Sequence, residues 1–231
     1  MDFNFKTEPY QHQLTALEDS WAASHYALLM EMGTGKTKVA LDTMVKLWEE
    51  RKISAALVIA PKGVYDNWIK NEIPTHVPTE IEPLILRWQP NISKKYEDEV
   101  SRFLFDQTGA LKIFVMNVEA FSTPKGVKMA NTFCKHHPDN LVIVDESTTI
   151  KNRKAQRTKN IVSLNKVSKY RRILTGSPIT KSPMDLFSQC LFLDKKALGF
   201  ENFFAFQARY SILARRTINN RSFQKITGYC R

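Results

Sequence analysis

A glycine-rich loop between an apolar run and an amphipathic stretch is the most chemically specific feature of the sequence. Its residues 33–37 read Gly-Thr-Gly-Lys-Thr; the loop follows Ala27–Met30 and leads into Lys36–Glu50. A loop that leaves a strand and opens a helix directs its backbone amides at an anion. Glycine permits the torsions that this loop needs, and lysine adds a mobile cation. The pattern predicts a Walker A loop that binds a nucleoside triphosphate.

Each position of the loop has an expected part in binding. We expect Lys36 to contact the β and γ phosphates and the Thr37 hydroxyl to ligate Mg²⁺. The residues expected to contact ATP are Met32, Gly33, Thr34, Gly35, Lys36 and Thr37. Met30 stands where the motif usually has its outer glycine. The alternative interpretation is a glycine turn followed by an ordinary exposed lysine.

Two adjacent carboxylates follow a second apolar run. Leu141–Val144 is continuously apolar, as in a strand that is buried on both faces, and Asp145 and Glu146 come directly after it. Ligands of open α/β sheets bind beyond the carboxyl ends of the strands. We therefore expect Asp145 to hold Mg²⁺ beside the loop and Glu146 to polarise the attacking water. With Lys36 they form the expected catalytic set; the alternative is a strand end with solvated acids.

The elements that must position these residues alternate along the chain. Short apolar runs that predict strands are Ala27–Met30, Ala55–Ala60, Pro83–Leu86, Lys112–Met116, Leu141–Val144 and Arg172–Leu174; amphipathic stretches that predict helices are Gln11–Ala22, Lys36–Glu50 and Ser93–Phe105. The stretch 74–83 contains three prolines and predicts a loop. This alternation indicates an α/β fold of the P-loop NTPase type, with a mostly parallel sheet flanked by helices.

Composition and charge limit the class of protein. The 231 residues suit one domain, with 43% hydrophobic residues, three cysteines and no apolar run of membrane-spanning length. We expect a cytoplasmic, DNA-associated protein without a signal peptide, of bacterial or phage origin. Residues 1–146 carry a net charge of −4 and residues 147–231 a net charge of +15, which together give +11. A cationic second portion indicates a polyanionic partner such as nucleic acid, or a solvated basic surface.

Several segments together resemble the superfamily-two helicases and translocases, most closely their Swi/Snf-like branch. The Gly-Thr-Gly-Lys-Thr loop with Glu31 before it is similar to the branch's Walker A loop, and Asp145 and Glu146 occupy the place of its DExx box. Leu174–Ile179, which reads Leu-Thr-Gly-Ser-Pro-Ile, resembles motif III. The remaining segments are Pro9–Gln11 for the Q motif, Ala60–Trp68 for motif Ia, Asn117 for the motif Ib region and Ile150–Gln156 for the segment after the box. The resemblance runs in order from about Pro9 to Phe206.

The resemblance implies roles for further residues. Gln11 would contact the adenine edge, and Lys62, Trp68 and Asn117 would face the DNA strand. Thr175, Gly176 and Ser177 would couple the nucleotide state to DNA contact. Trp68 has an equally good interpretation as a core residue, Lys62 as a loop lysine and Gln11 as an exposed helix residue.

The chain departs from the branch in the acidic box. Ser147 and Thr148 replace the usual small residue and histidine, and that histidine helps to link the ATP state to motif III. Thr148 would replace it only with a shorter reach. Ser177 replaces the common threonine of motif III and keeps its hydroxyl.

The resemblance also implies an incomplete motor. The branch has two RecA-like lobes with ATP between them, and no second set of motifs follows Ile179. We expect residues 1–231 to form the first RecA-like lobe alone, with the second lobe supplied in cis or in trans. The predicted function is the ATP-binding lobe of a DNA-dependent ATPase that translocates on double-stranded DNA without sequence preference, with ATP and Mg²⁺ as cofactors. The alternatives are a strand-separating or branch-migrating helicase of the same superfamily and a catalytically incomplete DNA-binding module.

Overall fold

A six-stranded parallel sheet forms the centre of the protein. The computed structural model describes residues 3–218 and 221–230. The strand order is β1-β6-β5-β2-β4-β3, and every neighbouring pair is parallel. The strands are β1 (His25–Leu29), β2 (Ala55–Ala60), β3 (Leu84–Arg87), β4 (Lys112–Asn117), β5 (Asn140–Asp145) and β6 (Tyr170–Thr175). The predicted α/β class with a mostly parallel sheet is therefore confirmed.

The central strands are the most apolar stretches of the chain. Every residue of β2 and β5 is buried, because helices cover both faces of the sheet at that point. All six strands lie within two residues of the bounds that the apolar runs predict. A fully buried parallel strand reads as a short apolar run, and that is why these runs located the sheet.

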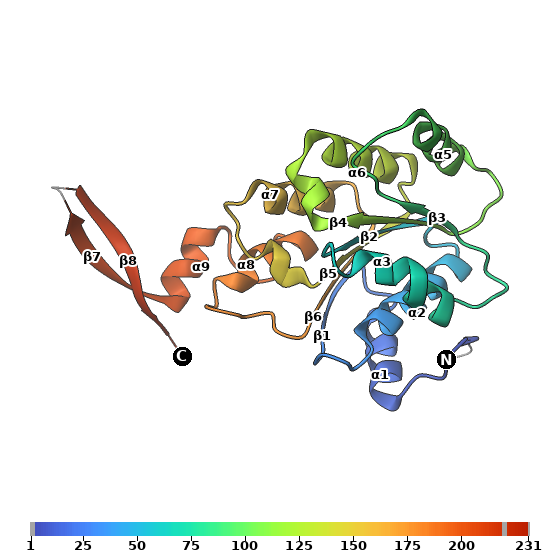
Figure 1. The fold of residues 1–231 in the computed structure, drawn as a ribbon. Coiled ribbons are helices and arrows are strands. Elements are labelled where there is room, and N and C mark those ends of the chain that lie inside the picture. The colour runs from blue at the N-terminus through green and yellow to red at the C-terminus, as the bar shows by residue number, and fades with distance from the viewer. Residues whose placement is uncertain (1–2, 219–220, 231) are drawn as a thin grey trace.

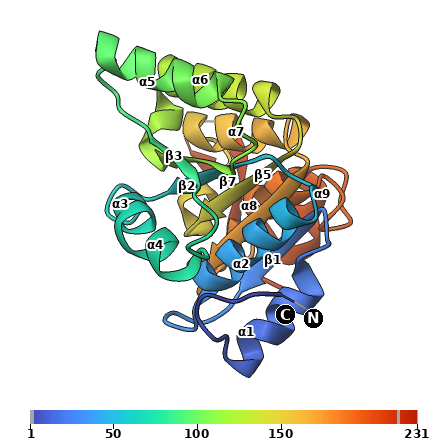
Figure 2. The ribbon, with the colours of Figure 1, turned by 90° about the vertical axis from the view of Figure 1, so that its right-hand side faces the viewer.

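Helices cover both faces of the sheet and enclose two separate hydrophobic clusters (Figures 1 and 2). One face carries α1 (Gln11–Ser20), α2 (Lys36–Glu49), α3 (Tyr65–Asn67), the π-helical turn η1 (Trp68–Glu72) and α4 (Ile73–His76). The other carries α5 (Lys94–Phe105), α6 (Pro124–His136), α7 (Gln156–Ser163) and α8 (Asp185–Leu193). Short 3₁₀ turns are η2 (Val118–Ser122), η3 (Ser147–Ile150) and η4 (Leu164–Lys166). None of the described helices has the length and apolarity needed to cross a membrane.

Two regions differ from the sequence-based expectation. The expected loop 74–83 begins inside α4, which ends at His76. After α9 (Phe203–Tyr210), the strands β7 (Ser211–Ile218) and β8 (Arg221–Tyr229) form an antiparallel hairpin that projects away from the sheet (Figure 1). The hairpin was not predicted. Asn219 and Asn220, which separate its strands in the sequence, lie outside the described residues.

Candidate nucleotide-binding site

The predicted motifs meet at the carboxyl edge of the sheet. β6 lies between β1 and β5, with Leu29 opposite Thr175 and Asp145 opposite Leu174. The Walker A loop leaves β1, the acidic pair ends β5 and the motif III segment leaves β6. Three segments from distant parts of the sequence are therefore neighbours in space.

The Walker A loop has the backbone conformation that its glycines allow. Gly33 has a φ of 77° and Gly35 a φ of 84°, both in the left-handed region that side chains disfavour. Gly35 precedes the first residue of α2, so that the loop passes directly into the helix. A Cβ atom on Gly35 would lie 2.2 Å from Nε2 of Gln13. This position therefore needs glycine for its torsion and for the close approach of Gln13.

Lys36 lies folded against its own loop. Its side chain is only 8% exposed, and its Nζ donates to the carbonyl oxygens of Met30 at 3.0 Å and Glu31 at 2.8 Å. The hydroxyl of Thr34 also donates to the Glu31 oxygen, at 2.7 Å. A buried ammonium held by loop carbonyls suits an anionic ligand, because charged phosphate oxygens accept stronger hydrogen bonds than carbonyls do.

Two side chains of α1 hold the loop from outside. Gln13 donates from Nε2 to the carbonyl oxygen of Thr34 at 3.0 Å, and its Oε1 accepts from the amide of Tyr10 at 3.0 Å. A ring nitrogen of His12 lies 2.9 Å from the same Thr34 oxygen. Gln11 is exposed at the start of α1, and its contact with adenine stays a prediction. Sequence reasoning missed Gln13, although its place on α1, on the same helical turn as Gln11, was a signal.

Asp145 is buried, and both of its carboxylate oxygens accept hydrogen bonds. Oδ2 accepts from the indole Nε1 of Trp68 at 2.9 Å, and Oδ1 accepts from the amide of Glu146 at 2.9 Å. Burial raises the pKa of the Asp145 carboxyl, and these two hydrogen bonds and the charge of Lys36 oppose that rise. Each carboxylate oxygen has a second lone pair, so that Asp145 can also ligate a cation.

The expected DNA contact of Trp68 is wrong in this structure. Its side chain is 0% exposed and packs in the cluster between the sheet and α2. Trp68 instead supports the acidic pair, because it is the donor to Asp145. The physical reason is that an indole buries a large apolar surface when its single N–H finds an acceptor, and the Asp145 carboxylate provides one.

Glu146 has an unusual backbone conformation. Its φ of 45° and ψ of 60° place it in the left-handed region, directly between β5 and η3. Such a conformation costs on the order of 1–3 kcal/mol in a residue other than glycine and is concentrated at functional sites. Arg51 shares the conformation, but there it simply follows the end of α2. Burial, followed by the charge of Asp145, raises the pKa of the Glu146 carboxyl, which suits a proton acceptor near neutral pH.

The motif III segment touches the Walker A loop. A Cβ atom on Gly176 would lie 3.2 Å from the amide nitrogen of Met32, so that the backbones approach closely. Thr175 is buried, and its hydroxyl accepts from the amide of Ser177 at 3.2 Å, while the Ser177 side chain is exposed. The structure thus brings Thr175, Gly176 and Ser177 beside the loop. Their coupling role stays a prediction.

The two remaining residues expected to contact DNA lie on the next strands along the same edge. Ala60 at the end of β2 is opposite Asn117 at the end of β4, and Lys62 follows two residues after Ala60. Lys62 is exposed. The Oδ1 atom of Asn117 accepts from the amide of Ala120 at 2.8 Å, and this bond caps η2. Neither position excludes a DNA contact, and both stay predictions.

The donor set at this edge fits magnesium and a nucleoside triphosphate. Mg²⁺ takes oxygen ligands and is usually held by one or two carboxylates together with phosphate oxygens. Asp145 provides a carboxylate and Thr37, in the first turn of α2, provides a hydroxyl. The charge of Lys36 opposes the rise that burial causes in the pKa of both Asp145 and Glu146, because the ammonium group lies near both carboxyl groups.

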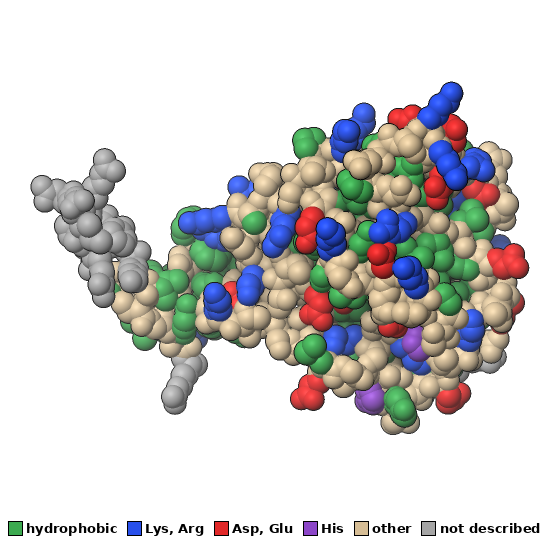
Figure 3. All heavy atoms as spheres, viewed as in Figure 1, with side chains coloured by type: hydrophobic (Ala, Val, Ile, Leu, Met, Phe, Trp, Pro, Cys, Tyr) green, Lys and Arg blue, Asp and Glu red, His purple; other side chains and the backbone are tan. Residues whose placement is uncertain are grey.

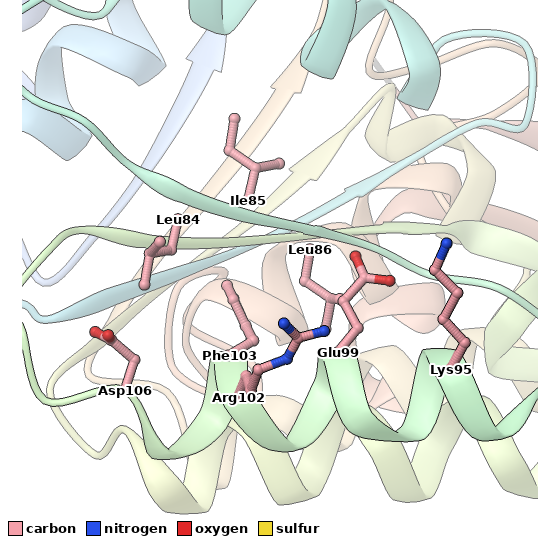
Figure 4. A pocket seen from close by; sticks show the side chains of 8 residues that line it. All are labelled: Leu84, Ile85, Leu86, Lys95, Glu99, Arg102, Phe103 and Asp106. Atoms are coloured by element: carbon pink, nitrogen blue, oxygen red, sulfur yellow. The ribbon is translucent and has the colours of Figure 1, made fainter.

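A separate hollow lies at the other edge of the sheet. It is formed by β3 and α5 and is lined by Leu84, Ile85, Leu86, Lys95, Glu99, Arg102, Phe103 and Asp106 (Figure 4). β3 is the edge strand opposite β1. The hollow is therefore not part of the site formed by the Walker A loop.

The chain is similar in sequence to known proteins. A family model described as "SNF2-related domain" matches residues 12–228. Curated relatives include the mouse "DNA repair and recombination protein RAD54-like", 30% identical over 73% of this chain and 22% of the relative. Another is the "ATP-dependent helicase fft2" of Schizosaccharomyces pombe, 26% identical over 71% of this chain and 12% of the relative. The chain thus spans less than a quarter of the length of these two proteins.

A solved structure has the same fold. The "Sulfolobus solfataricus SWI2/SNF2 ATPase core in complex with dsDNA" superposes with a TM-score of 0.69. It is 21% identical in sequence, and the match covers 91% of this chain and 40% of the other chain. The likeness supports the RecA-like fold that the sequence predicts.

Proposed function

The chain belongs to the SNF2-related domain family, and on that premise we propose that it is the ATP-binding lobe of a DNA-dependent ATPase that translocates on double-stranded DNA. One observation carries the proposal: the Walker A loop, the acidic pair and the motif III segment leave three adjacent strands at one edge. Ligands of open α/β sheets bind at that edge. Two relatives, an ATP-dependent helicase and a DNA repair and recombination protein, support the same activity.

The residues of the site have complementary chemical parts in ATP hydrolysis. Lys36 would exchange its two carbonyl partners for phosphate oxygens. Thr37 and Asp145 would hold Mg²⁺, which when bound neutralises charge on the phosphates. Glu146 would orient a water molecule and accept its proton, because burial keeps the pKa of this carboxyl above its usual value.

The proposal that the chain binds DNA is based on residues at the other half of the same sheet edge. Lys62 and Asn117 follow the neighbouring strands β2 and β4, so that one edge would carry nucleotide on one side and DNA on the other. The solved structure with the same fold contains double-stranded DNA. We propose that DNA is bound through its phosphates, because the chain offers a net charge of +15 over residues 147–231.

We propose that rapid hydrolysis requires a second RecA-like lobe, supplied in cis or in trans. A supplied arginine finger is worth about 10³–10⁵ in the rate of comparable phosphoryl transfers. The side chains of Arg215, Arg216 and Arg221 lie outside the described residues, and no part in the site is assigned to them. The 231-residue chain is expected to bind ATP and to hydrolyse it slowly.

The test is calorimetric titration of ATP with Mg²⁺ into the 231-residue chain. Lys36→Ala should weaken binding at least about tenfold, because hydrogen bonds to charged groups are worth about 1.5–3 kcal/mol. Glu146→Gln should bind as the unaltered chain does, since the amide keeps the shape and loses the proton acceptor. Lys46→Ala, on the same helix but paired with Glu50, is the matched control and should leave the affinity unchanged.

A phosphate-release assay with double-stranded DNA completes the test. Slow release that rises when a second lobe is added, and that Glu146→Gln abolishes, would support the proposal. Equal ATP affinity in the unaltered chain and in Lys36→Ala would refute the proposed site. Brisk DNA-stimulated release by the 231-residue chain alone would show that the second lobe is dispensable.

A further inference from the structure

We propose that Gln189 is a positioning residue that couples the acidic pair to the motif III segment; the inference rests on the proposed ATPase function and adds a residue to it. Gln189 lies on α8 and is 0% exposed. Its Oε1 accepts from the hydroxyl of Ser147 at 2.6 Å, and its Nε2 donates to the carbonyl oxygen of Pro178 at 2.8 Å. Ser147 directly follows the acidic pair, and Pro178 belongs to the motif III segment.

The hydrogen-bond partners determine how the Gln189 amide is oriented. Nε2 also donates to the carbonyl oxygen of Asp185 at 2.7 Å. The Pro178 and Asp185 oxygens can only accept, so that both must face the NH₂ group. Oε1 then faces Ser147, whose hydroxyl donates. Both amide hydrogens and the amide oxygen are used, and a shift of Ser147 must therefore either break a buried hydrogen bond or move Gln189.

The same helix holds both segments at further points. The Asp185 carboxylate accepts from the amide and hydroxyl of Thr180, at 3.0 and 2.8 Å, and from the amide of Lys181 at 2.8 Å. Ser188 donates to the carbonyl oxygen of Lys151 at 2.9 Å. Helix α8 is thus attached to the chain after the acidic pair and to the chain after β6, and Gln189 bonds to both of these segments from the same helix.

The two ends of this connection are both at the nucleotide site. Ser147 is adjacent to the strained Glu146, and Pro178 is two residues from Gly176, which packs against the backbone of Met32. A change at the phosphates thus has a continuous path of contacts from the Walker A loop through motif III and Gln189 to the acidic pair. Buried networks in which every partner is satisfied favour one arrangement of their members.

This connection answers the question raised by the departures in the acidic box. Thr148 was expected to replace the family's coupling histidine with a shorter reach. Ser147, and not Thr148, connects the box to motif III. Its hydroxyl bonds to Gln189, whose longer side chain reaches the carbonyl oxygen of Pro178. Sequence reasoning could not find the pair, because the two residues are 42 positions apart.

The experiment measures how nucleotide changes the exchange of backbone amide hydrogens in the segment 176–181. It uses the 231-residue chain with Mg²⁺ and a non-hydrolysable ATP analogue. Binding should slow exchange in this segment of the unaltered chain. In Gln189→Leu and Ser147→Ala the analogue should still bind, with a change of less than about tenfold, the scale of one net hydrogen bond. The nucleotide-dependent slowing should be lost in both variants.

Controls separate coupling from a merely structural part. Ser188→Ala removes the hydrogen bond from the same helix to the Lys151 carbonyl oxygen and should keep the slowing, because that bond is not on the path from motif III through Gln189 to Ser147. Ser147→Thr keeps the hydroxyl and should restore the response. The double variant Ser147→Ala with Gln189→Leu replaces both partners by apolar groups, and it guards against misfolding because neither the Ser147 hydroxyl nor the Gln189 amide oxygen is left unpaired.

Two results would overturn the inference, and they are distinguishable. If Gln189→Leu speeds exchange equally with and without the analogue, Gln189 only holds the fold together. In that case the ratio of the exchange rates measured with and without the analogue is the same in the variant as in the unaltered chain. If the unaltered chain does not bind the analogue at all, the proposed function fails and the coupling role fails with it.

Discussion

At the scale of single residues, Asp145 and Glu146 are neighbours with different surroundings. Asp145 is 6% exposed, and both of its oxygens accept hydrogen bonds. Glu146 is less buried and has a left-handed backbone. Carboxyl groups whose environments differ in this way can have different parts in one reaction. The fixed carboxylate suits a metal ligand, and the freer one suits a proton acceptor.

Trp68→Phe should raise the pKa of Asp145 further. The Trp68 hydrogen bond lowers that pKa, and the variant removes it while burial remains. Because the folded protein then binds this proton more tightly, the carboxylate form is lost at a higher pH as the pH falls. Binding of ATP with Mg²⁺ should weaken at a higher pH than in the unaltered chain, as measured by calorimetry from pH 5 to about 8, the range in which stability is usually greatest.

Trp88→Phe is the matched control for this prediction. Trp88 is equally buried but lies in the cluster on the other face of the sheet. This variant should lose packing and leave the pH profile of binding where it was. Identical pH profiles for Trp68→Phe and the unaltered chain would show that the indole N–H does not support Asp145.

Sequence predicted the residues of the site whose roles depend on their immediate neighbours. The Walker A loop, Asp145 and Glu146 were located because strand, loop and acid are consecutive in the chain. The contact between Trp68 and Asp145 spans 77 positions, and nothing local to either residue indicates it. Gln13 is a partial exception: its place beside Gln11 was a local signal, but its bond to Thr34 spans 21 positions and forms only when α1 packs beside α2.

At the scale of elements, predictability depended on burial. β2 and β5 are buried along their whole length, and their apolar runs were unmistakable. β7 and β8 form a two-stranded sheet of their own, and the short apolar run Ile212–Ala214 is followed directly by two arginines and a threonine, so that it was not taken for a strand. Pairing within the hairpin satisfies the hydrogen bonds of the backbone. It does not require the buried apolar side chains from which strands were predicted.

Helix α2 has an ion pair in its buried face. Nζ of Lys38 lies 2.7 Å from Oδ2 of Asp42, and both side chains are at most 5% exposed. Burial raises the pKa of Asp42 from 3.8 to about 6, against the hydrogen bond and charge of Lys38. The folded protein therefore binds this proton more tightly than the unfolded chain. The resulting stabilisation is complete below about pH 4 and is lost as the pH rises through about 6.

Asp42→Asn should remove this pH dependence. The asparagine amide stays neutral and still accepts from Lys38. The difference in the free energy of unfolding, variant minus unaltered chain, should increase by up to about 3 kcal/mol between pH 4 and pH 7. One pKa unit corresponds to about 1.4 kcal/mol. Urea unfolding at both pH values measures the gain. Parallel pH profiles for the two proteins would contradict the assignment.

At the scale of the whole molecule, charge is divided unevenly. Only three of the 23 acidic residues follow Glu146, and acidic side chains lie mostly on the part of the molecule that carries the sheet and the earlier helices (Figure 3). The later part includes a groove between α7 and α8 that is lined by Arg153, Lys159, Lys166 and Lys195. A surface of this kind attracts a polyanion through its field before any specific contact forms.

DNA binding should therefore fall steeply with salt. The logarithm of the association constant should decrease with the logarithm of salt concentration, with a slope of roughly −0.9 for each phosphate neutralised. Lys62→Ala should reduce that slope by about one unit and weaken binding to all sequences alike. Fluorescence anisotropy with two unrelated duplexes measures both effects.

Lys94→Ala, on α5 at the other edge of the sheet, is the matched control and should leave the slope unchanged. Affinity that does not depend on salt, or tight binding to one of the two duplexes only, would contradict a phosphate-based interaction.

The strand order has a consequence for how the protein is made. β1 is the first strand of the chain and an edge strand, and in the described sheet its neighbour is β6, the last of the six. Leu29 pairs with Thr175, and a ribosome synthesises residues in order, so β1 cannot pair with β6 until residue 175 has been made. The other strands can pair earlier, whereas the strand that leads into the Walker A loop is the last to be fixed. During synthesis the nascent chain thus has a partly built sheet, and its nucleotide site closes only when β6 is inserted.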